Sequence, residues 1–484
     1  MNRRDFLKLS AGTGALTLIP GCFLATPEPQ KKKLNFVFIL IDDMGWTDAS
    51  CYGSTFYETP NIDRLAAGGM RFTNAYAACP VCSPTRASIL TGKYPARINL
   101  TDWTGPDKWH ARGKLSSPEY IRQMPLQELT TTEVLKKAGY ATCFVGKWHL
   151  GEEEKYYPEN QGFNVNKGGW RAGHPWDGYF SPYGNPKLQD GPDGEYLTDR
   201  LTDEALKFID QNSNKSFFLY LSYYAVHTPI QAKKHLIDKY TSKAEKLPPA
   251  DGPHYLPEGD NIMTRQIQDH PVYAAMLQTT DESIGRVMNR LKDLGLAGNT
   301  AVIFMSDNGG LSTRKSRNIP TSNLPLRAGK GWLYEGGIRV PMIIKWPAKV
   351  KPASVCNEPV TSTDFYPTML QMASLPLRPH QHIDGLSLVP LLTGTGKLDR
   401  NAIYWHYPHY HGSGSRPGGA VRAGNYKFIE FYEDNHVELY NLKDDVSEKH
   451  NLAKKMPQKT AQLREMLHIW RKSVRARMPK PKPE

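Results

Sequence analysis

Several side chains that can bind metal ions or move protons come shortly after short apolar runs in this sequence. They are Asp42, Asp43, Lys147, His149, His227, Asp307 and Asn308. In an open parallel sheet, ligands bind beyond the carboxyl ends of the strands, so groups that follow different strands can meet at one edge. We therefore expect one pocket that holds three carboxylates, an amide, a lysine and two histidines.

The carboxylates of this pocket predict a metal ion. Three carboxylates that share a site repel one another and raise one another's pKa values unless a cation lies between them. Carboxylate and amide oxygens suit Ca²⁺ or Mg²⁺ better than a softer metal. Taken alone, the pairs Asp42-Asp43 and Asp307-Asn308 are each also typical of a helix cap or a turn. The prediction therefore depends on the coincidence of the groups at one sheet edge.

A second reactive segment, residues 79–92, reads CPVCSPTRASILTG. Cys82 stands where a helix begins, with Pro84 in the first turn, and a helix N-terminus attracts anions. The Cys79-x-x-Cys82 spacing also occurs in thioredoxin-like redox pairs and in zinc sites. The sequence has no second Cys pair and no matching Cys/His set, which disfavours zinc.

Apolar, β-rich runs alternate with helical patterns, which indicates an α/β sheet with helices on its faces. The expected strands are 34–41, 142–145, 217–221, 301–305 and 342–346, and the expected helices are 61–67, 131–137, 202–211 and 272–294. The first four strands should run in the same direction. From about residue 399, expected strands at 402–406, 419–422, 426–432 and 437–440 and a helix at 457–472 predict a small antiparallel subdomain.

The composition is that of a globular protein, with 39% hydrophobic and 23% charged residues in 484. The 61 Lys and Arg against 48 Asp and Glu give a net charge of +13, which favours an anionic partner. Nucleic acid is disfavoured, because no basic stripe with interleaved aromatic residues appears. Basic residues interleaved with prolines between positions 471 and 483 predict a solvated tail.

The first residues read as an export signal. The segment 2–8, NRRDFLK, followed by a weakly apolar stretch to residue 20, has the order of a twin-arginine signal and is too short to span a membrane. The segment 19–22 also resembles a lipoprotein processing site, although Ile19 and Pro20 fit that pattern poorly, so a lipid anchor at Cys22 stays open. We expect an exported protein, periplasmic or at the cell surface, and the export machinery is one partner.

The later cysteines are Cys51, Cys79, Cys82, Cys143 and Cys356. Their number is odd, so a compartment that permits disulfides would still leave one of them unpaired.

Together these segments resemble the type I, formylglycine-dependent sulfatases of the alkaline phosphatase superfamily. The resemblance runs from about residue 35 to residue 452. Its motifs are IDDMG at 41–45, TPNIDRLA at 59–66, the CxPxR motif at 82–86 with LTG at 90–92, GKWHLG at 146–151, VHTP at 226–229, SDNGG at 306–310, KG at 330–331 with YEGGIRVP at 334–341, and ELYNL at 438–442.

The resemblance implies an α/β fold with an alkaline-phosphatase-like mixed sheet flanked by helices, and a smaller C-terminal antiparallel sheet. The implied divisions are an export signal and linker at 1–33, the catalytic domain at 34–375, and a C-terminal subdomain with sheet, helix and basic tail at 376–484. It also implies that a separate formylglycine-generating enzyme oxidises Cys82 to formylglycine before export. One Ca²⁺ would be held by the modified Cys82 and by the residues Asp42, Asp43, Asp307 and Asn308.

The resemblance also assigns roles in sulfate ester hydrolysis. Lys147, Lys330 and Arg86, with the Ca²⁺, would neutralise the sulfuryl group, and Arg86 would brace the hydrated aldehyde. One hydroxyl of that hydrate attacks sulfur and the other expels sulfate, whereas a plain serine or cysteine would remain as a stable adduct. His149 would steer the second hydroxyl, and His227 would protonate the leaving alcohol.

The expected substrate is a sulfated carbohydrate, a galactose-type glycan or a marine polysaccharide. Loops at 102–110, 170–176 and 405–411 are rich in aromatic and basic residues and could form a sugar-binding rim. The alternative within the superfamily is a phosphonate or phosphate ester hydrolase, although the single-metal ligand set and the Lys147-x-His149 spacing favour sulfate. An alternative of another class is a catalytically silent protein that binds sulfated glycans.

Overall fold

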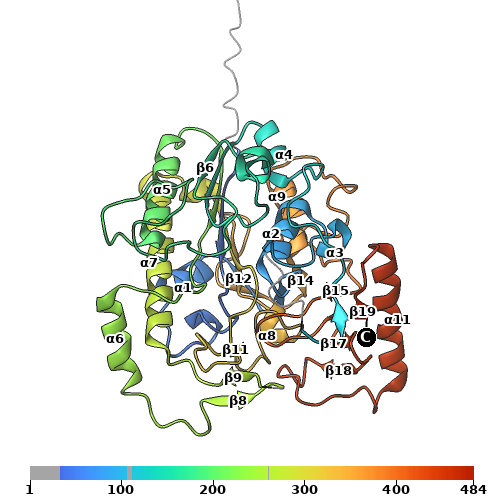
Figure 1. Ribbon diagram of the computed structural model, residues 1–484. Coiled ribbons are helices and arrows are strands. Elements are labelled where there is room, and N and C mark those ends of the chain that lie inside the picture. The colour runs from blue at the N-terminus through green and yellow to red at the C-terminus, as the bar shows by residue number, and fades with distance from the viewer. Residues whose placement is uncertain (1–32, 106–111, 260, 484) are drawn as a thin grey trace, which may run out of the picture. The chain divides into compact units, whose positions relative to one another are not determined.

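A mixed sheet of eight strands organises the computed structural model, which describes residues 33–105, 112–259 and 261–483 (Figure 1). Its strands in spatial order are β13 (Ser354–Cys356), β2 (Met70–Phe72), β12 (Met342–Lys345), β10 (Thr300–Ser306), β1 (Asn35–Ile41), β7 (Phe217–Ser222), β5 (Ala141–Gly146) and β6 (Val165–Lys167). The predicted export signal and Cys22 lie outside the described residues.

The central strands run in one direction, as the sequence predicted. Strand β1 is parallel to β10 and to β7, and β7 is parallel to β5. Strand β12 reverses the direction and pairs antiparallel with both β10 and β2. The carboxyl ends of β1, β5, β7 and β10 therefore meet at one edge of the sheet, which is where a ligand is expected to bind.

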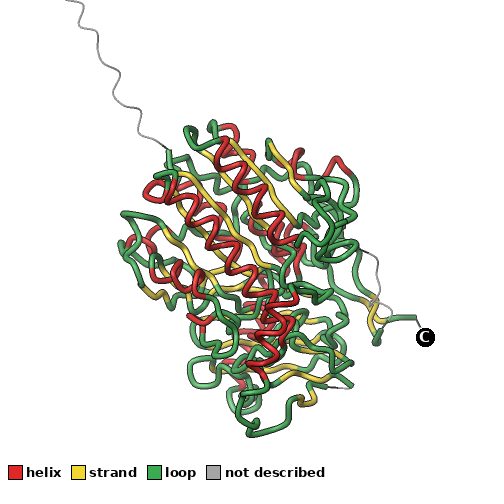
Figure 2. The backbone as a smooth tube through the Cα atoms, turned by 90° about the vertical axis from the view of Figure 1, so that its left-hand side faces the viewer, coloured by secondary structure: helices red, strands yellow, loops and turns green. Residues whose placement is uncertain are grey.

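Helices cover both faces of the sheet, because successive residues of a buried strand point to opposite sides. Val37, Ile39 and Ile41 pack against α1 (Pro60–Ala67), α5 (Leu197–Gln211), α6 (Lys234–Ala244) and α7 (Pro271–Asp293). The other face packs against α2 (Cys82–Thr91), α4 (Thr131–Lys137), α9 (Phe365–Met372) and α10 (Val389–Thr393). Figure 2 shows long helices lying along the strands. The α/β fold with helices on both faces is thus confirmed.

The C-terminal residues form a second, antiparallel sheet, also as predicted. Its order is β15 (Ile403–Tyr407), β16 (Gly418–Ala423), β17 (Tyr426–Phe431) and β18 (Val437–Asn441). Helix α11 (Pro457–Ser473) covers it and buries Leu463, Leu467 and Trp470 against this sheet.

The predicted basic tail is mostly exposed, but part of it is also ordered by contacts with the rest of the chain. Strand β19 (Lys480–Pro481) pairs with β4 (Leu115–Ser116), and Arg471 forms an ion pair with the nearly buried carboxylate of Glu430 at 2.9 Å. The tail is ordered in part because its backbone completes a strand pair, and Arg477 also lies 3.5 Å from the carboxylate of Glu119.

Further short strands and helices lie between the larger ones. They are β3 (Ala75–Tyr76), β8 (Tyr255–Pro257), β9 (Met263–Arg265), β11 (Thr313–Arg314), β14 (Val360–Thr361), α3 (Pro95–Ile98), α8 (Glu335–Ile338), and the 3₁₀ helices η1 (Ser50–Tyr52), η2 (Glu154–Tyr156), η3 (Pro158–Gln161), η4 (Ala297–Asn299) and η5 (Ser362–Asp364). Among the described residues, no helix is long and apolar enough to span a membrane. The five cysteines in this part of the chain are all free thiols.

Candidate active site

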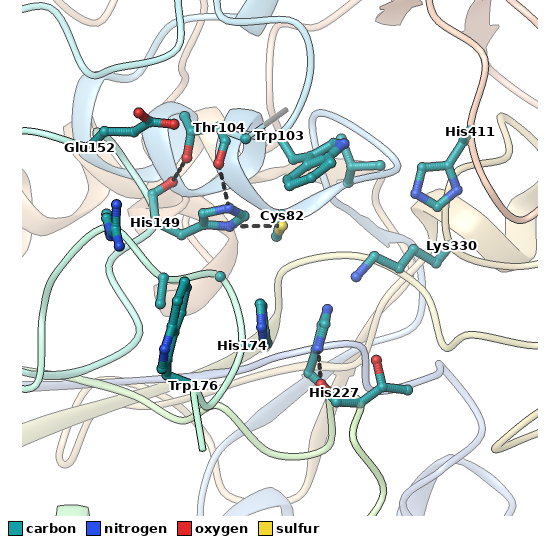
Figure 3. A pocket seen from close by; sticks show the side chains of 16 residues that line it. Cys82, Trp103, Thr104, His149, Glu152, His174, Trp176, His227, Lys330 and His411 are labelled. Carbon is teal, nitrogen blue, oxygen red and sulfur yellow. Dashed lines mark hydrogen bonds between the residues drawn. The ribbon is translucent and has the colours of Figure 1, made fainter. Parts of the chain in front are cut away.

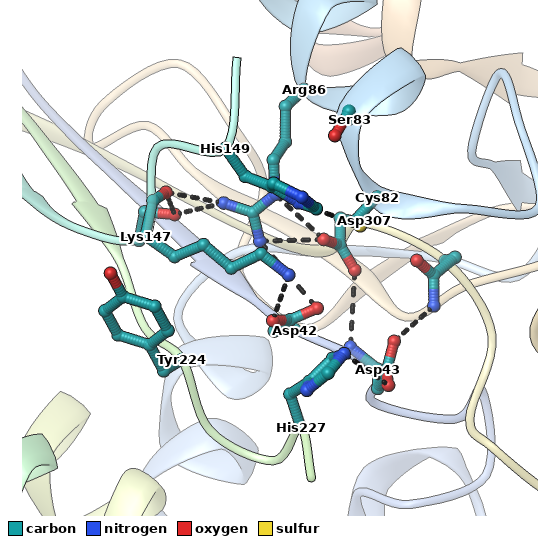
Figure 4. A network of polar contacts seen from close by, with 12 residues as sticks. Asp42, Asp43, Cys82, Ser83, Arg86, Lys147, His149, Tyr224, His227 and Asp307 are labelled. Atoms are coloured by element: carbon teal, nitrogen blue, oxygen red, sulfur yellow. Dashed lines mark hydrogen bonds and ion pairs between the residues drawn. The ribbon is translucent and has the colours of Figure 1, made fainter. Parts of the chain in front are cut away.

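The polar groups that follow β1, β5, β7 and β10 come together in one buried network (Figure 4). Lys147, just after β5, donates to Asp42, just after β1, with Nζ 2.5 Å from Oδ2, and both side chains are fully buried. Arg86 of α2 donates from Nη2 to Oδ2 of Asp307, after β10, at 2.7 Å. The structure therefore places carboxylates from two strand ends against cations from two other elements.

Arg86 acts as a brace for this network. Besides Asp307, its guanidinium donates to the Lys147 carbonyl at 2.7 Å and to Oγ of Ser222 at 2.6 Å. Burial opposes the charge of this side chain, but Asp307 and Asp42 hold the pKa of Arg86 above its ordinary value. Arg86 thus fixes the position of the carboxylate of Asp307 and of the chain that carries Lys147.

Asp43 is held by residues from two other loops. Nζ of Lys330 lies 2.6 Å from Oδ1 of Asp43, and Nδ2 of Asn308 donates to the same oxygen at 2.8 Å. Burial opposes ionisation, but Lys330 and His227 lower the pKa of Asp43 below its ordinary value. Asp43 also has a left-handed backbone, with φ of 61°, a conformation that is uncommon outside glycine.

The donor set fits a divalent cation. Oδ1 of Asp42 and Oδ1 of Asn308 are both buried and have no hydrogen-bond partner in the structure. Buried polar atoms are nearly always satisfied, so two unsatisfied oxygens in one acidic cluster indicate a missing partner. Burial, and then the neighbouring Asp307, raise the pKa of Asp42 to about 8, although Lys147 and Arg86 oppose the shift.

Oxygen donors of this kind suit Ca²⁺ or Mg²⁺. Ligand atoms of Asp42, Asp43 and His227 also lie within 4.8 Å of one another.

Cys82 begins helix α2 and faces His149. Its Sγ lies 3.3 Å from Nδ1 of His149, whose Nε2 lies 3.0 Å from the carbonyl oxygen of Thr104. Because a carbonyl can only accept, Nε2 carries the proton and Nδ1 is free to accept one from the group at position 82. Burial, and then Lys147 and Arg86, lower the pKa of His149 well below its ordinary value, which keeps the ring neutral and leaves the lone pair of Nδ1 as an acceptor.

The unmodified Cys82 thiol is a poor nucleophile in this position. Burial raises the pKa of Cys82, although Lys147 and Lys330 oppose the shift. The thiolate is the nucleophilic form of cysteine, so a thiol held protonated is unreactive at neutral pH.

His227 lies at the other side of Asp43. Its Nε2 is 3.7 Å from Oδ2 of Asp43, and its Nδ1 is 2.7 Å from the carbonyl oxygen of Thr228. Nδ1 therefore donates, which leaves Nε2 toward the cluster. Burial and Lys330 lower the pKa of His227 well below its ordinary value.

A cavity of about 710 Å³ opens above these groups, and Cys82, His149, His227 and Lys330 all line it. Figure 3 shows Cys82 beside His149, with Lys330 and His411 coming from the opposite side of the view. A cavity of this size can enclose a small ligand or a sugar. Lys330 is positioned through its backbone, because Oγ of Ser413 donates to its carbonyl at 2.7 Å.

The segments predicted to form a sugar-binding rim line the cavity in part. Trp103, Arg171, His174, Trp176 and His411 line the cavity. The beginning of the segment 405–411 does not line the cavity, because the indole of Trp405 is buried and donates to the Ala77 carbonyl at 2.8 Å. His406 is likewise buried, against the carbonyl of Arg477 at 2.9 Å. Residues 106–110 of the first segment lie outside the described residues.

Sequence reasoning missed several residues of the site. Glu152 lines the cavity, Ser222 binds Arg86, and Ser413 holds Lys330. Glu152 follows the GKWHLG segment and Ser222 directly follows the strand predicted at 217–221, so position along the chain could have identified both. Nothing in the sequence places Ser413 near Lys330.

Comparison with known proteins agrees with this arrangement. Residues 34–375 match the family model described as Sulfatase, and residues 328–474 match the model described as N-sulphoglucosamine sulphohydrolase, C-terminal. Residues 1–20 match the model of the twin-arginine translocation signal sequence, which indicates export across a membrane.

Curated relatives are named as sulfatases, and a solved structure has a similar fold. A sulfatase of Formosa agariphila is 34% identical over 89% of this chain and 86% of its own length. N-acetylgalactosamine-6-sulfatase of Sus scrofa is 34% identical over 77% of this chain and 68% of its own. The crystal structure of Ps i-CgsB in complex with k-i-k-neocarrahexaose is 29% identical, with a TM-score of 0.73 and 91% and 93% of the two chains covered.

The fold, the cavity above Cys82 and these matches agree with one another. The chain belongs to the sulfatase family, with the alkaline-phosphatase-like fold, and is an enzyme that hydrolyses sulfate esters.

Proposed function

We propose that the protein removes sulfate from a sulfated carbohydrate, with formylglycine made from Cys82 as nucleophile and one bound Ca²⁺. The observation that carries the proposal is the contact between Cys82 and the acceptor nitrogen of His149 at the base of the cavity, directly beside the buried acidic cluster. A formylglycine-generating enzyme would be the partner that matures Cys82.

Asp42, Asp43, Asp307 and Asn308 would hold the Ca²⁺, and the modified side chain at position 82 would complete its surroundings. The metal would withdraw charge from the sulfuryl oxygens and favour attack on sulfur. Lys147 and Lys330 neutralise the carboxylates in the protein without substrate, and Lys330, which lines the cavity, can donate to a sulfate oxygen once a bound cation neutralises Asp43. Arg86 holds Asp307 in place rather than reaching into the cavity.

Formylglycine would supply a hydrated aldehyde, whose two hydroxyls can attack sulfur and then expel sulfate. His149 is placed to take a proton at Nδ1 from a hydroxyl at position 82, because its other nitrogen is fixed on Thr104. His227 would give a proton from Nε2 to the leaving alcohol. The negative charge of a bound sulfate beside Lys330 would raise the pKa of His227, so that Nε2 carries the proton that it gives to the alcohol.

A sulfated glycan is the substrate class that relatives and cavity support together. Relatives are N-acetylgalactosamine-6-sulfatases by name, and Ps i-CgsB was solved with a neocarrahexaose. The exposed Trp176 in this cavity offers a ring on which a sugar can stack. We propose a galactose-type glycan or a marine polysaccharide, hydrolysed in the periplasm or at the cell surface.

Two further assignments are part of the proposal. The chain would divide into a signal and linker to residue 33, a catalytic domain at 34–375 and a C-terminal subdomain from 376. A lipid anchor at Cys22 would decide between a tethered and a free periplasmic enzyme.

Replacing His227 by alanine is expected to lower kcat/KM for sugar sulfates by about 10²- to 10⁴-fold. The loss should stay within about tenfold for aryl sulfates with acidic phenol leaving groups, because these need little proton donation. The measurement is kcat/KM across leaving groups of different pKa, with the exposed His235→Ala as the matched control. Equal losses of kcat/KM on sugar and aryl sulfates would show that His227 is not the general acid.

Comparing aryl sulfate with aryl phosphate and phosphonate esters in the same experiment tests the alternative within the superfamily. Faster turnover of a phosphorus ester would replace the sulfate assignment.

A further inference from the structure

We propose that Arg171 forms a second anion-binding site in the substrate cavity, which takes a second sulfate or a carboxylate group of the same glycan. This inference rests on the proposed function, because it names which sulfated carbohydrates the cavity selects. The sugar that loses its sulfate would then carry, or adjoin a unit that carries, another negative charge.

The first observation is the way Arg171 is held. Its guanidinium carbon lies 5.6 Å from the ring centre of Trp170 and 5.2 Å from that of Trp176, and the two indoles are tilted by 62° to each other. Guanidinium groups stack on aromatic rings, which fixes the plane of the group and lowers the entropy lost when it binds a ligand. Arg171 lines the cavity, so the fixed group is offered to the substrate.

The second observation is the charge of Arg171. The cationic side chains nearest the reaction centre are already paired with carboxylates. Lys147, Lys330 and Arg86 each form an ion pair at 2.7 Å or less. Arg171 is exposed, and among the described residues no carboxylate forms an ion pair with it, including Glu152 of the same cavity. A preorganised guanidinium without a protein anion is suited to bidentate binding of a sulfate or carboxylate.

The third observation ties Arg171 to the reaction centre. The carbonyl of Trp170 accepts from the backbone N–H of His149 at 3.3 Å. On the other side of Arg171, a Cβ added to Gly173 would lie 2.3 Å from the His149 ring, so the chain passes in direct contact with it. Two peptide units span at most about 8 Å, so the backbone of Arg171 is close to both contacts.

This placement fixes which part of the substrate Arg171 can reach. In Figure 3, Trp176 and His174 of the same segment lie across the view from Lys330 and His411. An anion on Arg171 would therefore belong to the sugar unit whose sulfate lies above Cys82 or to the unit next to it. A monosulfated neutral sugar would leave the guanidinium without a ligand.

The test compares Arg171→Ala and Arg171→Lys in the matured enzyme. The substrates are a nitrophenyl sulfate, a monosulfated neutral sugar, a disulfated sugar, and a monosulfated disaccharide that contains a uronic acid. The matched control is Arg378→Ala, an exposed arginine that does not line the cavity. Lysine keeps the charge but loses the planar fork, so Arg171→Lys should restore part of the lost affinity.

We expect Arg171→Ala to raise KM for the polyanionic sugars by about 10- to 100-fold with little change in kcat. Activity on the nitrophenyl sulfate and on the monosulfated neutral sugar should change by less than about threefold. Loss confined to the disulfated sugar would identify sulfate as the second anion, and loss confined to the uronate would identify carboxylate.

An equal fall in kcat on all four substrates would overturn the inference, since it would mean that Arg171 only supports His149. An unchanged KM for both polyanionic sugars would overturn it as well. Failure of the proposed function would look different, because the unaltered enzyme would then release no sulfate from any of the substrates.

Discussion

Replacing Cys82 by alanine is expected to abolish sulfate ester hydrolysis, with a loss of about 10⁴-fold or more. Alanine cannot become formylglycine, and it leaves the proton-accepting Nδ1 of His149 with nothing to act on. The four side chains proposed to bind Ca²⁺ through oxygen remain in the variant, so Ca²⁺ should still raise its melting temperature. The measurements are kcat/KM for an aryl sulfate and thermal unfolding with Ca²⁺ and with a chelator.

Cys79→Ala is the matched control, because Cys79 is an equally buried cysteine of the same segment that does not line the cavity. It should retain activity within about tenfold, since it removes only a buried thiol. Comparable activity in Cys82→Ala and Cys79→Ala would show that Cys82 is not the nucleophile.

Removing the divalent cation is expected to lower activity by at least about 100-fold and to lower the melting temperature by a few degrees. Without it the three carboxylates are compensated only by Lys147, Lys330 and Arg86, and Oδ1 of Asp42 and of Asn308 stay unsatisfied. The measurement is a titration of Ca²⁺ into chelator-treated enzyme, followed by activity and by thermal unfolding.

Asp307→Asn should raise the Ca²⁺ concentration for half-maximal activation by at least about tenfold, because it removes one charged ligand. Asp48→Asn makes the same chemical change at another fully buried carboxylate, which binds Tyr273 and lies outside the proposed ligand set. That control should keep the unaltered Ca²⁺ midpoint even if it is less stable. Equal midpoints in both variants would contradict the assigned metal site.

The central strands could be predicted because each is a long, fully buried run. Strand β1 was expected at 34–41 and lies at Asn35–Ile41, and β7 was expected at 217–221 and lies at Phe217–Ser222. The short strands β2, β13 and β6 were missed, since three residues carry no detectable periodicity. Helix α6 was missed for a different reason: it buries only Leu236 and Tyr240.

The positions of the candidate site residues could likewise be predicted only in part from the sequence. Asp42, Lys147 and Asp307 follow buried strands, so strand direction alone predicts that they meet. Lys330 follows no strand, and only the family resemblance singled it out; its position depends on contacts such as that with Ser413, more than 80 residues away in sequence. The resemblance implied that Arg86 helps to neutralise the sulfuryl group and braces the hydrated aldehyde; its contact with Asp307 was not predicted, because tertiary partners decide the direction of a long side chain.

The sequence also does not decide which of the predicted rim residues line the cavity. Trp176 and Trp405 look equivalent in the sequence, yet one indole is exposed in the cavity and the other is buried against the Ala77 carbonyl. A loop that carries aromatic and basic residues predicts either packing or binding, and only the tertiary fold decides between the two.

Peptide mass spectrometry across Cys82 tests the central claim most directly, on protein produced with a formylglycine-generating enzyme and assayed in parallel for release of sulfate and phosphate from aryl esters. The account predicts a mass about 18 Da below that of the cysteine peptide, whereas ordinary thiol oxidation adds mass. It also predicts that sulfate release rises with the modified fraction. An active sulfatase with an unmodified Cys82, or a modified protein that releases only phosphate, would contradict the account.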